Sequence, residues 1–287
     1  MSEELKDLVE LFAQTGEIQN VEERQAFAAA LQLPINRYIE ADNIARTIFT
    51  VDHIGPEGSA IYPKDIAGID AWVVPSITSA PQNLVGMEEI HVPTFAIDSS
   101  VEWTLALARQ RRFDIVRRQA VVLRDAIVRK ENKIAWDLVR GALSPDRTVA
   151  LTGETTLTKS AYNKGFQMMT SKDGFKVDLV IANAKRASDI REWSSNDLDP
   201  TTMREVWRSA GIGNIWGADI ITFNELEDNE VFFFDTSRLG AMPIKQDFTT
   251  FDDPTAITKF RQRVLGYEDV GFVVFDANAI VKVELDQ

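Results

Sequence analysis

The chain holds few residues of the types that carry out catalysis or bind metal. Cysteine is absent, and the only histidines are His53 and His91. Both fall in β-type segments, and neither has another histidine at helical spacing, so we interpret each as a structural or surface residue. The lack of cysteine excludes disulfides, thiolate nucleophiles and cysteine-bound zinc.

Motifs with a known mechanism are also missing. There is no G-x-S-x-G elbow, no H-E-x-x-H pair and no phosphate-binding P-loop. The glycines between Gly211 and Gly217 have the wrong spacing for a dinucleotide-binding turn, and they precede an expected strand instead of following one. We interpret this segment as a tight loop.

Paired carboxylates could perform acid–base chemistry or bind a cation. Among such pairs are Asp197 with Asp199, Asp252 with Asp253, and Glu268 with Asp269. The second pair precedes Pro254 and the third follows Tyr267, which is typical of turns. The five tryptophans after residue 100 are scattered, as core or interface anchors would be. We therefore predict no catalytic residue, metal or cofactor, and no enzyme.

Composition places the chain among ordinary globular proteins. It has 287 residues, 45% hydrophobic and 26% charged, with a net charge of −13. This length allows one large domain or two smaller ones. An acidic chain is not expected to bind DNA in a sequence-specific way. No apolar run of membrane-spanning length occurs, and the acidic start does not resemble a secretory signal, so we expect neither a membrane span nor secretion. The absence of cysteine fits folding in a reducing cytosol.

The charge is unevenly distributed. Residues 100–143 contain ten Lys and Arg against five Asp and Glu, a local balance of +5, so the remainder carries −18. A basic rod on an acidic molecule can attract further copies of the same molecule. The alternative is a helix face that is simply solvated. The basic residues that we select as candidate contacts between subunits are Arg111, Arg112, Arg117, Arg118 and Arg124.

The first 45 residues are predicted to form short helices. In residues 1–15 an apolar stripe of Leu5, Leu8, Val9 and Phe12 has helical spacing, and a second helical stretch covers residues 21–32. Such helices bury little surface alone, so we expect them to pack on their own domain or on a neighbouring subunit. Leu5, Leu8 and Phe12 are therefore candidate contacts between subunits.

Residues 46–99 differ in composition from the segment before them. Short β-rich runs at 46–51, 71–74 and 89–92 are separated by glycines and prolines, and five of the ten prolines lie here. This pattern predicts strands and hairpins and excludes a long helix. Trp72, within the second run, is a further candidate for contact with another subunit.

A long stretch without proline or glycine follows. From Ser100 to Arg140 apolar residues recur every three to four positions over much of the stretch, which predicts one helix over about 99–143. Ser99 or Ser100 could cap its start, and Gly141 with Pro145 could end it. At 1.5 Å per residue this helix would be about 60 Å long, which is the length of a strut.

The remaining chain reads as α+β. After a Thr-rich linker over 148–158 we predict helices at 159–170, 184–193 and 200–209. Strands are predicted at 177–182, 218–223, 230–234, 240–250, 257–264, 267–275 and 279–285. The run at 230–234 contains three consecutive phenylalanines, so we expect it to be covered on both faces.

The order of these parts resembles the major capsid proteins of tailed bacteriophages, whose Hong Kong 97-type fold is shared with encapsulin shells. The resemblance covers nearly the whole chain. It is carried by four segments, Val92–Ile97 leading into the long helix, Val177–Asn183, Val231–Lys245, and Tyr267–Phe275 with Ala279–Val283.

The resemblance implies an α+β fold with an N-terminal arm (1–45), an extended loop with flanking strands (46–98) and a spine helix of the peripheral domain (99–150). A mainly axial domain would follow (151–240), and then C-terminal strands shared by both domains (241–287). It implies self-assembly into pentamers and hexamers of a virion capsid around double-stranded DNA, assembled in the host cytoplasm. Separate scaffold, portal and decoration proteins are implied partners, with no membrane.

Two other functions are compatible with the same residues. An encapsulin-type compartment would have the same fold but would enclose a cargo enzyme. A cytosolic α+β enzyme could build its site from scattered carboxylates that no spacing reveals. A coiled-coil adaptor is disfavoured because the chain has one long helix, whose apolar seam is interrupted at Lys130.

Overall fold

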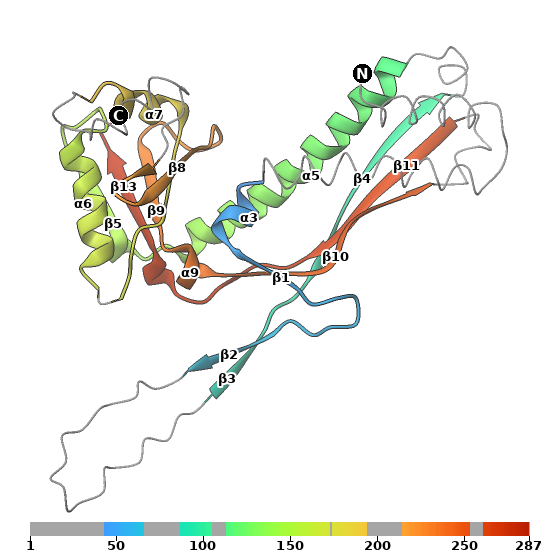
Figure 1. Ribbon diagram of the computed structural model, residues 1–287, viewed down its shortest axis with the longest axis horizontal. Coiled ribbons are helices and arrows are strands. Elements are labelled where there is room, and N and C mark those ends of the chain that lie inside the picture. Colours follow the sequence, from blue (N-terminus) through green and yellow to red (C-terminus); the bar gives the residue numbers. More distant parts are fainter. Residues whose placement is uncertain are drawn as a thin grey trace, which may run out of the picture.

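The computed structural model describes residues 43–65, 87–104, 113–172, 174–193, 214–252 and 261–286. It is an α+β structure built on two main sheets, a two-stranded ribbon and one long helix (Figure 1). Its helices are α3 (Ala45–Ile48), α5 (Phe113–Ala142), α6 (Lys159–Thr170), α7 (Ala184–Arg191) and α9 (Thr236–Leu239), with 3-10 turns at Pro145–Arg147 and Ala277–Ala279.

The first sheet is long and strongly extended, and we call it the peripheral sheet. Its strand order is β1-β10-β11-β4, with β12 paired to β10; β1 and β10 are parallel and the other pairs are antiparallel. Its strands are β1 (Thr50–His53), β4 (Phe95–Thr104), β10 (Gly240–Asp252), β11 (Arg261–Val270) and β12 (Val273–Val274). In Figure 1 this sheet runs beside α5 over much of the helix's length.

The second sheet is compact, and we call it the axial sheet. Its order is β5-β13-β9-β6-β8-β7. Its strands are β5 (Thr148–Leu151), β6 (Leu179–Ala182), β7 (Asn214–Ile215), β8 (Ala218–Thr222), β9 (Glu230–Phe234) and β13 (Ile280–Leu285). All five residues of β9 are buried, which confirms the expectation that this phenylalanine-rich run is covered on both faces.

A two-stranded ribbon projects from the body of the molecule (Figure 1). It pairs β2 (Ile61–Asp65) with β3 (Met87–His91), and Ile61 lies opposite His91. The strand expected near Glu89–Val92 is therefore confirmed. The run at 71–74 and Trp72 lie outside the described residues, as do the expected helices at 1–15, 21–32 and 200–209.

The predicted start of the long helix is wrong. Residues 99–104 belong to strand β4, so Ser99 and Ser100 are strand residues and cap no helix, and Val92–Ile97 leads into this strand. Ile97 and Trp103 are buried while the residues beside them are exposed, which is the two-residue alternation of a strand. Helix α5 has 30 residues and is about 45 Å long.

Three shorter predictions need correction. The segment expected as a strand from Arg46 begins with helix α3, and only Thr50–His53 forms β1. The expected Thr-rich linker starts with β5, which pairs in parallel with β13, a partner more than 130 residues away. The expected strand 267–275 is divided between β11 and β12. Pairing with distant strands decided the last two cases, and local composition does not report it.

The core has two parts, one on each face of the axial sheet. On one face, Phe232 and Phe234 of β9 join a cluster that includes α5 and the peripheral sheet. On the other face, Phe233 joins a cluster with Tyr162 of α6 and Ile190 of α7. Successive strand residues point to opposite faces, so β9 supplies both clusters.

Gly165 of α6 shows how closely this second cluster is packed. A Cβ atom at Gly165 would lie 2.5 Å from Cε2 of Phe233, whereas one at Gly141 of α5 would have no heavy atom within 4 Å. We predict that Gly165→Ala lowers the free energy of unfolding by about 1–3 kcal/mol through overpacking. Gly141→Ala is the matched control, and it should raise stability by up to about 1 kcal/mol. Urea denaturation of the unassembled subunit measures both, and equal effects would contradict the packing.

Candidate functional site: the two attachments of the long helix

Helix α5 lies between the two sheets and is anchored to each. Toward the peripheral sheet, Ile127 is fully buried and packs beside Gly266 of β11, where an added Cβ would lie 3.4 Å from the Ile127 Cδ1 atom. Toward the axial sheet, the Trp136 ring stands edge-on to Phe232 with 4.8 Å between centroids. The helix therefore fixes the position of one sheet relative to the other.

A buried polar group reinforces the first attachment, and we call it the Arg46 cluster: Asn43, Arg46, Glu131, Asp247 and Glu268. Arg46 of α3 donates from Nε to Glu131 of α5 at 3.3 Å and from Nη2 to Asp247 of β10, also at 3.3 Å. Its Nη2 also pairs with Glu268 of β11. The side chain of Asn43 donates to the second oxygen of Glu131. One guanidinium thus joins three elements.

Burial dominates the electrostatics of this cluster. The side chains of Glu131 and Glu268 are fully buried, and burial raises the pKa of Glu131 to about 7 and that of Glu268 to about 8 against the opposing effect of Arg46. Burial by itself would lower the pKa of Arg46, but the three carboxylates raise it above its ordinary value. Arg46 therefore stays charged.

The sequence interpretation of Glu268 and Asp269 as turn residues is wrong. Glu268 lies within β11, in the inward register shared with Val264, Gly266 and Val270. Glu131 likewise lies among the buried residues Ile127, Val128 and Ala135 of α5. An acidic residue at a position where the helix or strand spacing predicts an apolar one is the sequence signal that could have indicated both buried carboxylates.

The second attachment carries a more exposed ionic network. Arg140, near the end of α5, donates to Glu230 of β9 at 2.7 Å and to Glu227 at 3.3 Å. Lys282 of β13 also reaches Glu230, at 3.3 Å. Because the Arg140 side chain is 37% exposed and Glu230 has a second cation, this network should contribute less to stability than the Arg46 cluster.

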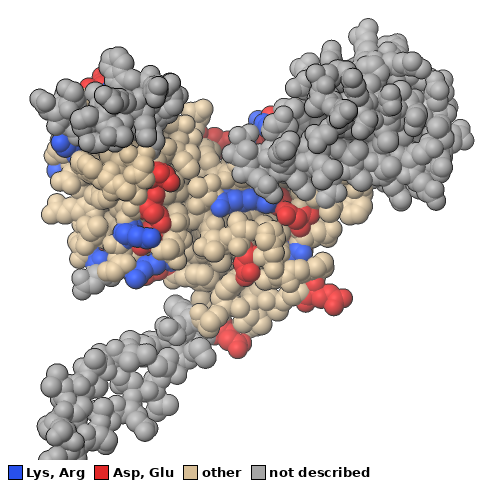
Figure 2. Space-filling view, in the orientation of Figure 1, with Lys and Arg blue, Asp and Glu red and all other residues tan. Residues whose placement is uncertain are grey.

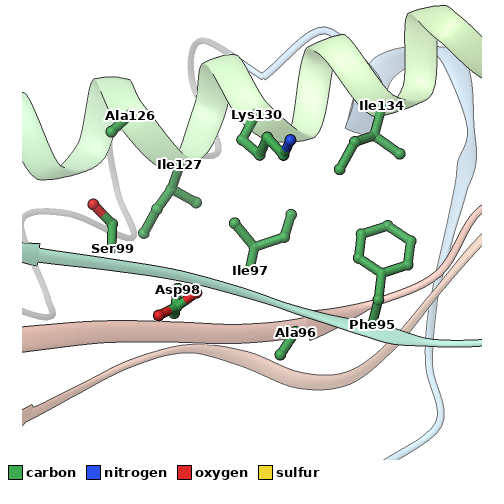
Figure 3. A pocket seen from close by; sticks show the side chains of 9 residues that line it. All are labelled: Phe95, Ala96, Ile97, Asp98, Ser99, Ala126, Ile127, Lys130 and Ile134. Atoms are coloured by element: carbon green, nitrogen blue, oxygen red, sulfur yellow. The ribbon is translucent and has the colours of Figure 1, made fainter.

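A cleft lies between α5 and strand β4 (Figure 3). Its volume is about 320 Å³, and nine residues line it, among them Phe95, Ile97, Ile127, Lys130 and Ile134. The lining is mainly apolar, with Lys130 on the helix side and Asp98 and Ser99 on the strand side. No catalytic constellation converges on it, because Lys130 and Asp98 are the only titratable groups that line it.

The candidate contact residues of the sequence analysis are not brought together by the described structure. Leu5, Leu8, Phe12, Trp72, Arg111 and Arg112 lie outside the described residues, while Arg117 and Arg118 fall in the first turns of α5. Arg124 is partly buried and donates from Nε to the adjacent Asp125 at 2.6 Å. Contacts with other subunits therefore remain predictions.

The described surface shows no site of another kind. His53 and His91 are exposed, and His91 lies 4.0 Å from Glu89. Within the described ranges no three His, Asp or Glu residues could hold a metal ion. The described helices also include none long and apolar enough to cross a membrane. On the face shown in Figure 2, acidic and basic side chains are interspersed, without a large patch of one sign.

This architecture matches solved structures over most of its length. A structure from Microbacterium phage Oxtober96 has a TM-score of 0.65 at 15% identity, with 85% of this chain and 91% of that chain covered. One from Mycobacterium phage Bobi has a TM-score of 0.62 at 12% identity, with coverage of 85% and 91%. The capsid of a native GTA particle has a TM-score of 0.57 at 15% identity, with coverage of 84% and 89%.

These matches identify the fold as the Hong Kong 97-type capsid fold, as the sequence predicted. Residues 88–283, more than half of the chain, match the family model described as phage capsid protein. The chain therefore belongs to the phage capsid protein family, and it is a structural protein of the virion capsid and not an enzyme. No curated protein matches the sequence closely enough to add a relative.

The two attachments should differ in strength because they differ in burial. We predict that Arg46→Ala lowers the free energy of unfolding by about 3–5 kcal/mol, since it leaves buried carboxylates without their cation. Arg140→Ala, in the exposed network, should cost about 1 kcal/mol or less. Denaturant titration of the two variants under identical conditions makes the comparison. A larger loss in the free energy of unfolding for Arg140→Ala than for Arg46→Ala would show that burial does not determine which attachment is stronger.

Proposed function

We propose that this protein assembles into the pentamers and hexamers of an icosahedral phage head that encloses double-stranded DNA. The observation that carries the proposal is the family match over residues 88–283, on a chain with the capsid fold. The solved GTA capsids, which were computed with C5 symmetry, support a five-fold arrangement of subunits with this fold.

The shape of the subunit supports assembly on physical grounds. A two-stranded ribbon is marginally stable alone in water, and β2–β3 projects from the body (Figure 1). Near its base, Ile61 and Phe275 are each 40% exposed, and the ring of Phe275 lies tilted against that of Tyr62 with 5.3 Å between centroids. Apolar surface and unpaired strand edges of this kind are stabilised by contact with another subunit.

The proposed interfaces include the basic part of α5 and the N-terminal residues. Arg111, Arg112, Arg117, Arg118 and Arg124 would face acidic surface of adjacent copies, since the chain outside residues 100–143 carries −18. Leu5, Leu8, Phe12 and Trp72 would pack on neighbouring subunits. Assembly would take place in the host cytoplasm with separate scaffold, portal and decoration proteins.

The packaged DNA would make only non-specific contact with the shell. A net charge of −13 weakens adhesion to phosphates, so the genome would be confined without being held tightly.

Electron microscopy with light scattering tests this function. The chain is expressed alone and together with its neighbouring genes, and closed shells tens of nanometres across are expected in at least one preparation. Double-stranded DNA inside shells from an infection or a full gene set supports a phage head, whereas an enzyme cargo would favour an encapsulin-type compartment. A uniform monomer or dimer under every condition would contradict the proposal.

Charge reversal on the long helix tests the proposed contacts. The double variant Arg117→Glu and Arg118→Glu should reduce the yield of shells at least tenfold, because repulsion replaces attraction at each copy of the interface. Lys185→Glu is the control, since Lys185 lies on α7 in an exposed pair with Asp228. Shell yield is measured by sedimentation. Normal assembly of the double variant, with its fold intact, would exclude the basic helix as an interface.

A further inference from the structure

The Arg46 cluster contains more acidic groups than one cation can balance. Three carboxylates, Glu131, Asp247 and Glu268, pair with the single guanidinium of Arg46. Asp247 is 47% exposed and can be solvated, but Glu131 and Glu268 have no exposed side-chain surface. Within the described part of the chain, no second cation contacts either buried carboxylate.

Two buried anions beside one cation are unfavourable, because the uncompensated charge has lost its hydration. The two carboxyls also differ in their hydrogen bonds. Glu131 accepts from the Asn43 side chain on one oxygen and from Arg46 on the other. Glu268 accepts from Arg46 on Oε1, while its buried Oε2 has no hydrogen-bond partner among the described residues. An ionised oxygen without a donor is the costlier one to bury, so Oε2 of Glu268 is the preferred place for a proton.

We propose that the Arg46 cluster is a binding site for a single proton, and that its occupancy controls whether the segment at Asn43–Ile48 stays attached to α5. The attachment depends on groups in or beside the cluster. The backbone N–H of Ala45 donates to the Asn132 side chain of α5 at 3.0 Å, and that of Arg46 donates to the Asn43 side chain at 3.2 Å. Loss of the Asn43–Glu131 and Arg46–Glu131 bonds would weaken the attachment of α3 to the long helix and leave the Ala45–Asn132 hydrogen bond in place.

Each element packed around the proton site contributes a polar or charged group. Helix α3 supplies Arg46, α5 supplies Glu131 and Asn132, β10 supplies Asp247, and β11 supplies Glu268. Asn43 precedes α3. Of these groups, Glu131 and Glu268 have a pKa that is raised into the range between pH 4 and pH 9, whereas Arg46 remains protonated.

The sign of the pH effect follows from the pKa values. We call the state with Asn43–Ile48 attached to α5 closed, and the state with this segment detached open. In the closed state burial raises the pKa of Glu131 to about 7 and that of Glu268 to about 8. In the open state the carboxyls are hydrated and titrate near their ordinary value. The closed state therefore binds the proton more tightly, and its advantage is fully present below the ordinary pKa of a glutamate. The advantage declines as pH rises and is lost above about pH 8.

Hydrogen exchange of the unassembled full-length chain tests this proposal independently of whether shells form. Exchange is followed by mass spectrometry between pH 6 and pH 9 and corrected for the intrinsic pH dependence of amide exchange. Protection of the amides at 45–49 should fall by up to about tenfold per pH unit and level off above about pH 8. Protection of β9, at the centre of the axial sheet, should stay constant.

Glu268→Gln should abolish most of this pH dependence, since an amide cannot release the proton. Asp247→Asn is the matched control, and it should keep the pH step because Asp247 is half exposed. If Glu268→Gln does not fold, as judged by β9 protection, Glu131→Gln replaces it with the same expectation. An unchanged step in the folded glutamine variant, a flat profile in the wild type, or equal loss of protection in β9 would each overturn the proposal.

Discussion

Trp136 stands edge-on against Phe232 of the axial sheet, and less than three turns earlier Ile127 packs beside Gly266 and Phe248 of the peripheral sheet. These two contacts lie on one helix, so the distance and angle between the sheets are set by the rigidity of α5. A helix this long can bury both contacts at once because its apolar stripe continues for several turns. Neither sheet could keep its position relative to the other if that stripe were broken.

The ionic groups at the two attachments of α5 differ in burial. At the axial sheet, Arg140 and Lys282 share Glu230 at the edge of the core, where water can replace either partner. At the peripheral sheet, Arg46 enters the interior with two buried carboxylates. Buried ion pairs contribute little to net stability but require a precise geometry, because any displacement leaves a buried charge unpaired. The second arrangement therefore specifies where α3 lies, while the apolar contacts supply most of the free energy.

The sequence pattern was sufficient to predict those helices and strands that are determined by residues near them in the chain. The helix predicted at 159–170 is confirmed as α6, whose start has a local cause because Thr158 accepts a hydrogen bond from the backbone N–H of Ala161. The strand predicted at 230–234 is confirmed as β9, whose three consecutive phenylalanines indicated burial on both faces. Residues 99–104 were wrongly predicted as helix because the two-residue alternation of β4 runs toward a long helix without an intervening proline or glycine. Ten paired positions with β11 make it a strand, and that partner lies more than 150 residues away.

The Arg46 cluster could not be assembled from sequence for the same reason. Its charged residues come from four elements between residues 46 and 268, and each looks ordinary in its own neighbourhood. Glu131 and Glu268 can be distinguished in the sequence only because each occupies a position in a regular series of apolar residues. Such a position predicts that the side chain is buried, but it does not predict which residue it pairs with. The structural relatives are 12–15% identical to this chain. Side chains can thus be replaced widely while the fold persists, provided that helix and sheets still meet. A protein whose work is assembly is accordingly recognised by the order and length of its elements, whereas an enzyme is recognised by a few residues that must stay the same.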